Sequence, residues 1–306
     1  MQGASFIDPE LLSQIADLEL LARTVVSGMS SGIHRSIHTG SSVEFAQYRP
    51  YVQGDDPRFV DWRLYGRTDR LHIKQFQEEN NLRATVLLDC SASMDYGSEG
   101  VTKFRYAQML AASLVVLMNG QRDVVGFGGY HHELCGYVPG RTQADQVHRI
   151  LVEIDGLRPE GTTDTAGALF FIGDVIPPRG MVVLISDLLH PIEGMVAHLR
   201  SLRARRHDVI VLQISDPAEQ TFPFDRSITL VDAEEDREQF TVPDAVREAY
   251  LENRSGHFDR IREECLAAEI DVEEFNCTEP LDRALHHFIR RRNRALFTTS
   301  LRQGVS

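Results

Sequence analysis

The chain has 306 residues, which is enough for one large domain or for a main domain with an extension. Its net charge of −13 argues against non-specific binding to nucleic acid or to an anionic membrane surface. The four cysteines form no C-x-x-C pair, which argues against structural zinc and a disulfide framework. No segment approaches the roughly 18 consecutive apolar residues of a membrane span, and no secretory signal pattern opens the sequence. We therefore expect a cytoplasmic protein that has no membrane span and does not bind nucleic acid.

The first 81 residues are expected to form an N-terminal extension. Residues 9–29 carry leucine, isoleucine and valine at helical spacing, which predicts an amphipathic helix. Residues 30–80 are rich in glycine, arginine, aspartate and aromatic residues, with short alternating stretches near 43–45 and 71–76. We interpret these stretches as strands in an irregular segment that packs on the main domain.

Strands and helices alternate through the main domain, residues 82–296. Apolar runs predict strands at 82–89, 124–127, 132–138, 181–187, 209–214 and 270–275. Helical spacing predicts helices at 103–118, 142–154, 164–174, 192–206, 243–268 and 281–289. This alternation predicts an α/β fold with a doubly wound, mostly parallel sheet and helices on both faces. An inserted segment is expected at about 216–262, with a strand-like stretch at 222–231, and a tail is expected at 297–306.

The strand that ends at Asp89 continues into Asp-x-Ser-x-Ser, which adds Ser91 and Ser93. One carboxylate and two hydroxyls then alternate on a tight loop at the C-terminal end of a strand, where open α/β sheets bind ligands. Ligands that are all oxygens suit a hard divalent cation, Mg²⁺ or Mn²⁺. This loop is the first part of a predicted metal site.

Two more segments complete the predicted site. Asp187 ends the strand 181–187, and Gly161-Thr162-Thr163-Asp164-Thr165 precedes a helix. The C-terminal ends of parallel strands share one edge of a sheet, so Asp187 can meet the Asp89 loop. Thr162, Thr163 and Thr165 are alternative sources of the threonine oxygen. Because hydroxyl ligands are neutral, a cation held there can attract an external carboxylate, which makes the site a docking point.

These segments resemble the metal-ion-dependent adhesion site of the von Willebrand factor A fold, which uses Asp-x-Ser-x-Ser, a threonine and an aspartate. The resemblance implies a Rossmann-like sheet and the five ligands Asp89, Ser91, Ser93, Thr163 and Asp187. Alignment with that family's Gly-Gly-Thr-Asn-Thr favours Thr163. The resemblance further implies that an acidic side chain of a partner completes the metal shell.

The extension carries a signature of its own. It runs through Glu44-Phe45, Arg49-Pro50-Tyr51 and the stretch Gly-Asp-Asp-Pro-Arg-Phe-Val-Asp-Trp at 54–62, and residues 244–250 fit the same pattern. This order is similar to a bacterial von Willebrand A-like family known as domain of unknown function 58. The resemblance implies an adaptor or chaperone partner of a MoxR-type AAA+ ATPase.

Three functions follow as alternatives. The first is a non-enzymatic, metal-ion-dependent protein-binding module. The second is a metal-dependent hydrolase, but phosphatases of the haloacid-dehalogenase type need an aspartate where this chain has Ser91. The third is a scaffold whose Asp89 loop holds no metal, with Asp89, Ser91 and Thr163 forming only local hydrogen bonds. Metal titration separates the third from the first, because a ligand that binds only the folded state raises its stability.

Overall fold

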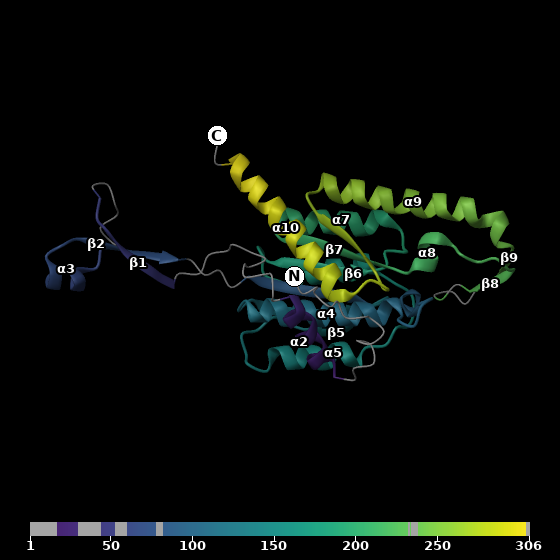
Figure 1. Ribbon diagram of the computed structural model, residues 1–306, viewed down its shortest axis with the longest axis horizontal. Coiled ribbons are helices and arrows are strands. Elements are labelled where there is room, and N and C mark those ends of the chain that lie inside the picture. The colour runs from purple at the N-terminus through teal and green to yellow at the C-terminus, as the bar shows by residue number, and fades with distance from the viewer. Residues whose placement is uncertain are drawn as a thin grey trace, which may run out of the picture. The chain divides into compact units, whose positions relative to one another are not determined.

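The computed structural model describes residues 17–29, 44–52, 60–77, 82–231, 233 and 238–303. The chain divides into two units, Ser36–Leu82 and the remainder, Met1–Arg35 with Arg83–Ser306 (Figure 1). We call them the extension unit and the sheet unit. The described helix of the expected extension, α2 (Leu18–Met29), belongs to the sheet unit and contacts its helices. Residues 9–16 of the expected helix lie outside the described residues.

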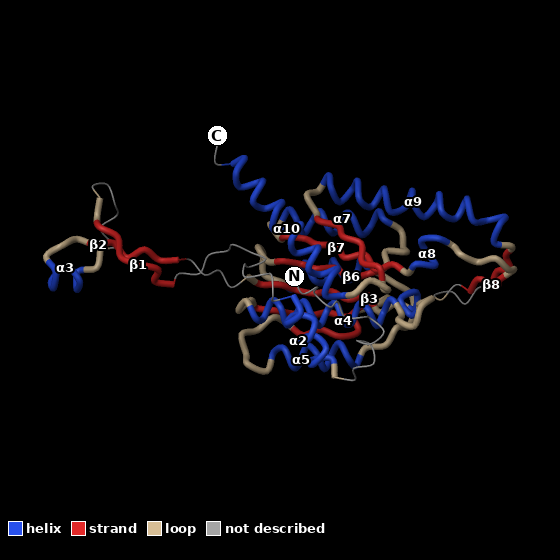
Figure 2. Tube along the Cα trace, in the orientation of Figure 1, coloured by secondary structure: helices blue, strands red, loops and turns tan. Residues whose placement is uncertain are grey.

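The sheet unit is built on one six-stranded sheet (Figure 2). Its strands are β3 (Arg83–Asp89), β4 (Val124–Tyr130), β5 (Leu134–Val138), β6 (Met181–Ser186), β7 (Asp208–Ser215) and β10 (Asp271–Asn276). They follow the order β10-β7-β6-β3-β4-β5, and every neighbouring pair is parallel except β4 and β5. The predicted doubly wound, mostly parallel sheet is therefore confirmed.

The sheet reverses its direction of growth between β3 and β6. The chain passes from β3 to β4 and β5 on one side, then crosses to β6 on the other side of β3. In the β3–β6 register Leu88 is opposite Ile185, so Asp89 and Ser186 reach the same edge together. Ligands of open α/β sheets bind in the crevice at such a topological switch point.

Helices cover both faces of this sheet. They are α4 (Lys103–Gly120), α5 (Gln146–Gly156), α6 (Thr165–Val175), α7 (Ile192–Ala204), α9 (Pro243–Ala267) and α10 (Leu281–Gln303). One core cluster joins α6, α7 and α9 to inward side chains such as Leu87, Leu184 and Val211. On the other face α4 packs with α5, α2 and α10. Helix α4 is buried on nearly all sides because apolar residues occupy most of its circumference.

The insertion after β7 contains elements that the sequence analysis missed. Helix α8 (Pro217–Thr221) is capped by Asp216, and β8 (Ile228–Val231) pairs antiparallel with β9 (Glu238–Thr241). The expected strand-like stretch is therefore limited to its last four residues. Helix α10 continues to Gln303 and so includes most of the segment that was expected to be a tail.

The extension unit contains a two-stranded antiparallel sheet, β1 (Glu44–Pro50) with β2 (His72–Gln77), in agreement with the predicted strands. Helix α3 (Trp62–Thr68) lies between them in the chain, and the Asp61 side chain caps it by accepting from two backbone N–H groups. Residues 53–59, which hold most of the 54–62 motif, lie outside the described residues. None of the described helices has the length and apolar character needed to cross a bilayer.

Candidate metal centre

Asp89, the last residue of β3, is the centre of the predicted site. Its side chain is only 1% exposed. Oδ1 accepts the backbone N–H of Ser91 at 2.9 Å, and Oδ2 accepts the hydroxyl of Ser186 at 2.7 Å. The chain then turns through a short 3-10 helix (Ala92–Asp95) that brings Ser91 Oγ within 3.1 Å of Ser93 Oγ. The three residues of the Asp-x-Ser-x-Ser motif therefore gather their oxygens at one point.

The threonine loop is held against this motif by the backbone. Ala92 N–H donates to the carbonyl of Gly161, and Glu160 N–H donates to the carbonyl of Cys90, each at 2.9 Å. These bonds bring Thr163 Oγ1 to 3.4 Å from Asp89 Oδ2. The loop thus carries one threonine hydroxyl to the buried carboxylate.

The other two threonines of the loop are placed differently. Thr165 Oγ1 is engaged by the hydroxyl of Tyr130 and by the ring of His190, and its side chain is buried. Thr162 is exposed. Of the three alternatives, the structure places Thr163 beside Asp89.

Asp187 follows β6 and is also buried. Its Oδ1 accepts the backbone N–H of Leu189 at 3.2 Å, while Oδ2 accepts from the ammonium of Lys103 at 2.7 Å. Leu188, which lies between Asp187 and Leu189 in the chain, has a φ of 59°. This left-handed conformation bends the chain back immediately after the strand. The carboxylate is thereby fixed close to the Asp89 loop by a turn and by an ion pair.

Lys103 is a residue of this site that the sequence analysis missed. It lies in the first turn of α4, is fully buried, and also donates to Glu219 Oε1 at 2.6 Å. A cation in the first turn opposes the helix dipole, which favours negative charge at that end. Its two carboxylate partners offset this unfavourable placement.

The electrostatics of the two aspartates differ. Burial and, to a smaller extent, the charge of nearby Asp187 raise the pKa of Asp89 to about 6, against the opposing effect of the hydrogen bonds from Ser186 and Ser91. Burial also acts to raise the pKa of Asp187, but the Lys103 ammonium outweighs it and holds that pKa below its ordinary value. Burial opposes the charge on Lys103, yet its two carboxylate partners raise its pKa.

Negative charge exceeds positive charge at the site. Among the described residues no cationic side chain forms an ion pair with Asp89, while Asp187 and Glu219 share the ammonium of Lys103. Asp89, Asp187 and Glu219 therefore bring three negative charges to the site against the single ammonium of Lys103, a net charge of −2 when all are ionised. This excess of negative charge favours the binding of a divalent cation.

The donor set suits a small, hard cation. The described residues contain no group of three or more histidine, cysteine, aspartate and glutamate side chains that could hold a metal. The oxygens here come instead from two carboxylates and three hydroxyls. Such ligands fit Mg²⁺ or Mn²⁺, which keep several bound waters, and do not fit zinc. The residues present therefore fit the cation that the sequence predicts.

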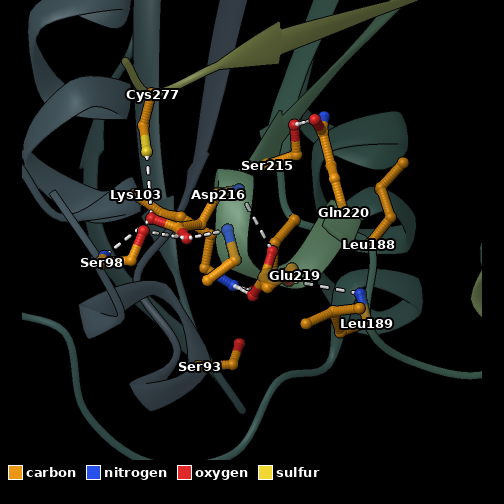
Figure 3. A network of polar contacts seen from close by, with 12 residues as sticks. Ser93, Ser98, Lys103, Leu188, Leu189, Ser215, Asp216, Glu219, Gln220 and Cys277 are labelled. Carbon is orange, nitrogen blue, oxygen red and sulfur yellow. Dashed lines mark hydrogen bonds and ion pairs between the residues drawn. The ribbon is translucent and has the colours of Figure 1, made fainter. Parts of the chain in front are cut away.

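A second polar network adjoins the site (Figure 3). Buried Asp216 accepts from the backbone N–H and the hydroxyl of Ser98, at 2.8 and 2.6 Å, and from the N–H of Ala218. It forms a capping box with Glu219 at the start of α8. Glu219 therefore joins the helix cap to Lys103, and Asp216 serves the cap rather than the metal site.

Comparison with known proteins gives the following matches. The sequence profile of the family described as protein of unknown function DUF58 matches residues 47–259. Uncharacterized proteins of Mycobacterium tuberculosis and Mycobacterium bovis are each 30% identical to the chain over 255 residues, which is 82% of this chain and 80% of theirs.

Solved structures give weaker matches. The conserved hypothetical protein BatB from Bacteroides thetaiotaomicron is 13% identical, with 70% of this chain and 99% of that one covered and a TM-score of 0.48. An aerotolerance-related membrane protein from Bacteroides fragilis is 18% identical, with 69% and 99% covered and a TM-score of 0.48. The SpRpn10 VWA domain is 9% identical, with 67% and 93% covered and a TM-score of 0.43.

Proposed function

The chain belongs to the DUF58 family, and on that premise we propose that it is a non-enzymatic, metal-ion-dependent protein-binding module. One observation carries the proposal. Segments that are 74 and 98 residues beyond Asp89 in the sequence bring Thr163 and Asp187 to the Asp89 loop, at the switch point of the sheet. Oxygen atoms that converge from three distant segments suit a hard divalent cation.

The proposed ligands are Asp89, Ser91, Ser93, Thr163 and Asp187. A bound Mg²⁺ or Mn²⁺ would supply an electrophilic centre that attracts an oxygen anion. Asp89 lacks an ion-pair partner among the described residues and would contribute its full charge, whereas Asp187 shares its charge with Lys103. Because the three hydroxyls are neutral, the cation would keep enough positive charge to bind an acidic side chain of a partner.

Binding suits these residues better than catalysis. The groups that hydrogen bond to Asp89 are hydroxyls and a backbone amide, which are poor general acids and bases at neutral pH. Lys103 is bound by two carboxylates, so its ammonium is poorly placed to give up a proton. The His190 ring is hydrogen bonded through Nε2 to the Thr165 hydroxyl, not to Asp89. These contacts support a docking role.

The partner we propose is a MoxR-type AAA+ ATPase, for which this chain would act as an adaptor. The support is the family resemblance of the extension, together with a site that selects for an acidic side chain. A pull-down from native cell extract with the tagged chain, in Mg²⁺ and in chelator, tests both parts. We expect the ATPase to be retained only in Mg²⁺.

The sharpest variant for this pull-down is Thr163→Ala. Asp187→Ala would leave the Lys103 ammonium buried with one fewer partner and could unfold the chain. Thr162→Ala is a matched control, because Thr162 is the exposed neighbour in the same loop. Retention of the partner should be lost in Thr163→Ala and kept in Thr162→Ala. Retention of the ATPase in chelator, or equal retention by both variants, would refute the metal-dependent adaptor function.

A further inference from the structure

A cavity of about 710 Å³ lies directly beside the candidate metal centre. Ser93, a candidate ligand, and Lys103 contribute to its wall on the side of the metal site. Residues of α8 and of the chain that follows it, strand β8, and Tyr250 of α9 form much of the remaining wall. The labelled elements α8, β8 and β9 lie together at one end of the sheet unit, beside the start of α9 (Figure 1). The cavity is therefore formed between the inserted segment, which the proposed metal site does not use, and residues next to that site.

The cavity is walled largely by aromatic and aliphatic side chains. Phe222 lies against Tyr250 and Phe224, with ring centroids 4.7 and 5.0 Å apart. Leu230 and Val231 of β8 are 38% and 57% exposed although they are large and apolar. Apolar surface left open beside polar groups is typical of a binding surface.

The charges around the cavity favour an uncharged occupant. Its described lining residues include only two charged side chains, Lys103 and Glu219, and these pair with each other at 2.6 Å. The ammonium is also satisfied by Asp187. An anionic or cationic group placed in the cavity would therefore find no free counter-charge and would lose its hydration.

We propose that this cavity receives a large apolar side chain of the protein partner, from a residue close to the acidic residue that docks on the metal. The proposal rests on the proposed function, because the shared residue Ser93 makes the cavity and the metal centre one continuous surface. Because Ser93 borders both sites and an extended chain advances about 3.3 Å per residue, we expect the two side chains to lie within about three residues of each other. The partner's recognition segment is thus acidic-plus-apolar, with leucine or phenylalanine as the second element.

A peptide library tests this inference on the full chain. The probe is a pool of seven-residue peptides with a fixed central aspartate and randomised flanks, selected for binding in Mg²⁺ and again in chelator. The best peptide is then measured by fluorescence anisotropy. We expect leucine, phenylalanine or tryptophan to be enriched within three positions of the aspartate. Their replacement by serine should weaken binding about tenfold or more.

Two variants of one hairpin locate the binding. Leu230→Glu introduces a charge into the cavity wall, while Phe240→Glu places the same charge on β9 at a residue that is 72% exposed and does not line the cavity. Leu230→Glu should weaken the selected peptide about tenfold, and Phe240→Glu should change its affinity less than about twofold. Circular dichroism and the metal titration establish that both variants remain folded.

The outcomes separate this inference from the proposed function. One outcome is that aspartate peptides bind in a magnesium-dependent way but show no apolar preference, and another is that they bind Leu230→Glu with the wild-type affinity. Either result overturns the proposed role of the cavity and leaves the proposed metal site in place. Apolar peptides that bind equally in chelator and are lost in Leu230→Glu support the cavity and overturn the metal dependence. A library that yields no apolar enrichment in either buffer overturns the cavity proposal.

Discussion

The ammonium of Lys103 donates to Asp187 Oδ2 at 2.7 Å, although the two residues are 84 positions apart in the chain. Asp89, the other buried carboxylate of the site, has no such cation among the described residues. One aspartate of the candidate centre is therefore paired with a cation of the protein itself, whereas the proposed external cation would balance the other. This asymmetry leads to separate predictions for the two aspartates.

Lys103→Met should destabilise the fold strongly. The substitution leaves Asp187 and Glu219 buried without their cation, and breaking a buried ion pair costs about 3 kcal/mol or more. Mg²⁺ should restore part of the lost free energy of unfolding, because a divalent ion supplies positive charge beside Asp187. Urea unfolding in Mg²⁺ and in chelator measures both effects.

The matched control for this lysine is Arg260→Met, which removes an exposed ion pair with Glu193. It should cost less than about 1 kcal/mol and should not depend on Mg²⁺. A Lys103→Met chain as stable as the control would show that the buried pair is not a structural element of the site.

In the metal-free chain, the contribution of Asp89 to stability should fall as pH rises from about 4 to about 6. The pKa of Asp89 in the folded chain is about 6, above its ordinary value of 3.8, so the folded state binds more protons than the unfolded state within this window. The loss can reach about 3 kcal/mol at neutral pH. Saturating Mg²⁺ should remove it, because the cation then balances the ionised carboxylate.

Asp89→Asn isolates this titration. Unfolding in chelator, followed at several pH values, should show that the variant lacks the Asp89 contribution and gains on the wild type as pH rises. An identical pH profile for the two chains would mean that Asp89 does not titrate in this window.

Asp216→Ala should weaken the start of α8 without abolishing metal binding. Asp216 accepts two hydrogen bonds from Ser98 and one from the N–H of Ala218, and the loss of an N-cap costs about 1–2 kcal/mol. Asp225→Ala, at an exposed position before β8, is the control and should be nearly neutral. Thermal unfolding of both variants with and without Mg²⁺ measures this. Loss of the Mg²⁺ effect in Asp216→Ala would show that the helix cap and the metal site are coupled.

The central strands of the sheet were predictable because they are largely apolar, in contrast to the edge strand β10, which carries Asp271, Glu273 and Glu274. The strands β3, β6 and β7 are buried along almost their whole length, so their sequences are continuous runs of apolar residues, which is typical of a strand covered on both faces. The hairpin β8–β9 has mostly exposed side chains and gives no such signal at β9. Helix α8 is too short for a periodic pattern, although Asp216, Pro217 and Glu219 form a recognisable start signal.

The site was predictable only in part. Motifs at strand ends indicated the acidic and hydroxyl groups, because the edge of a parallel sheet collects them irrespective of sequence distance. Lys103 and Glu219 are not part of any motif that the sequence analysis recognised. Their pairing depends on how α4 and α8 pack on the sheet, and this tertiary arrangement is not encoded in any local pattern. The cavity likewise depends on the placement of the inserted segment.

The most direct test of the central claim is isothermal titration calorimetry of Mn²⁺ into the metal-free chain and into Asp89→Asn. We expect one ion per wild-type chain, and no binding by the variant in the same concentration range, because Asp89 is the carboxylate without an internal cation. Wild-type protein that takes up no ion, or a variant that binds as well as the wild type, would contradict the account.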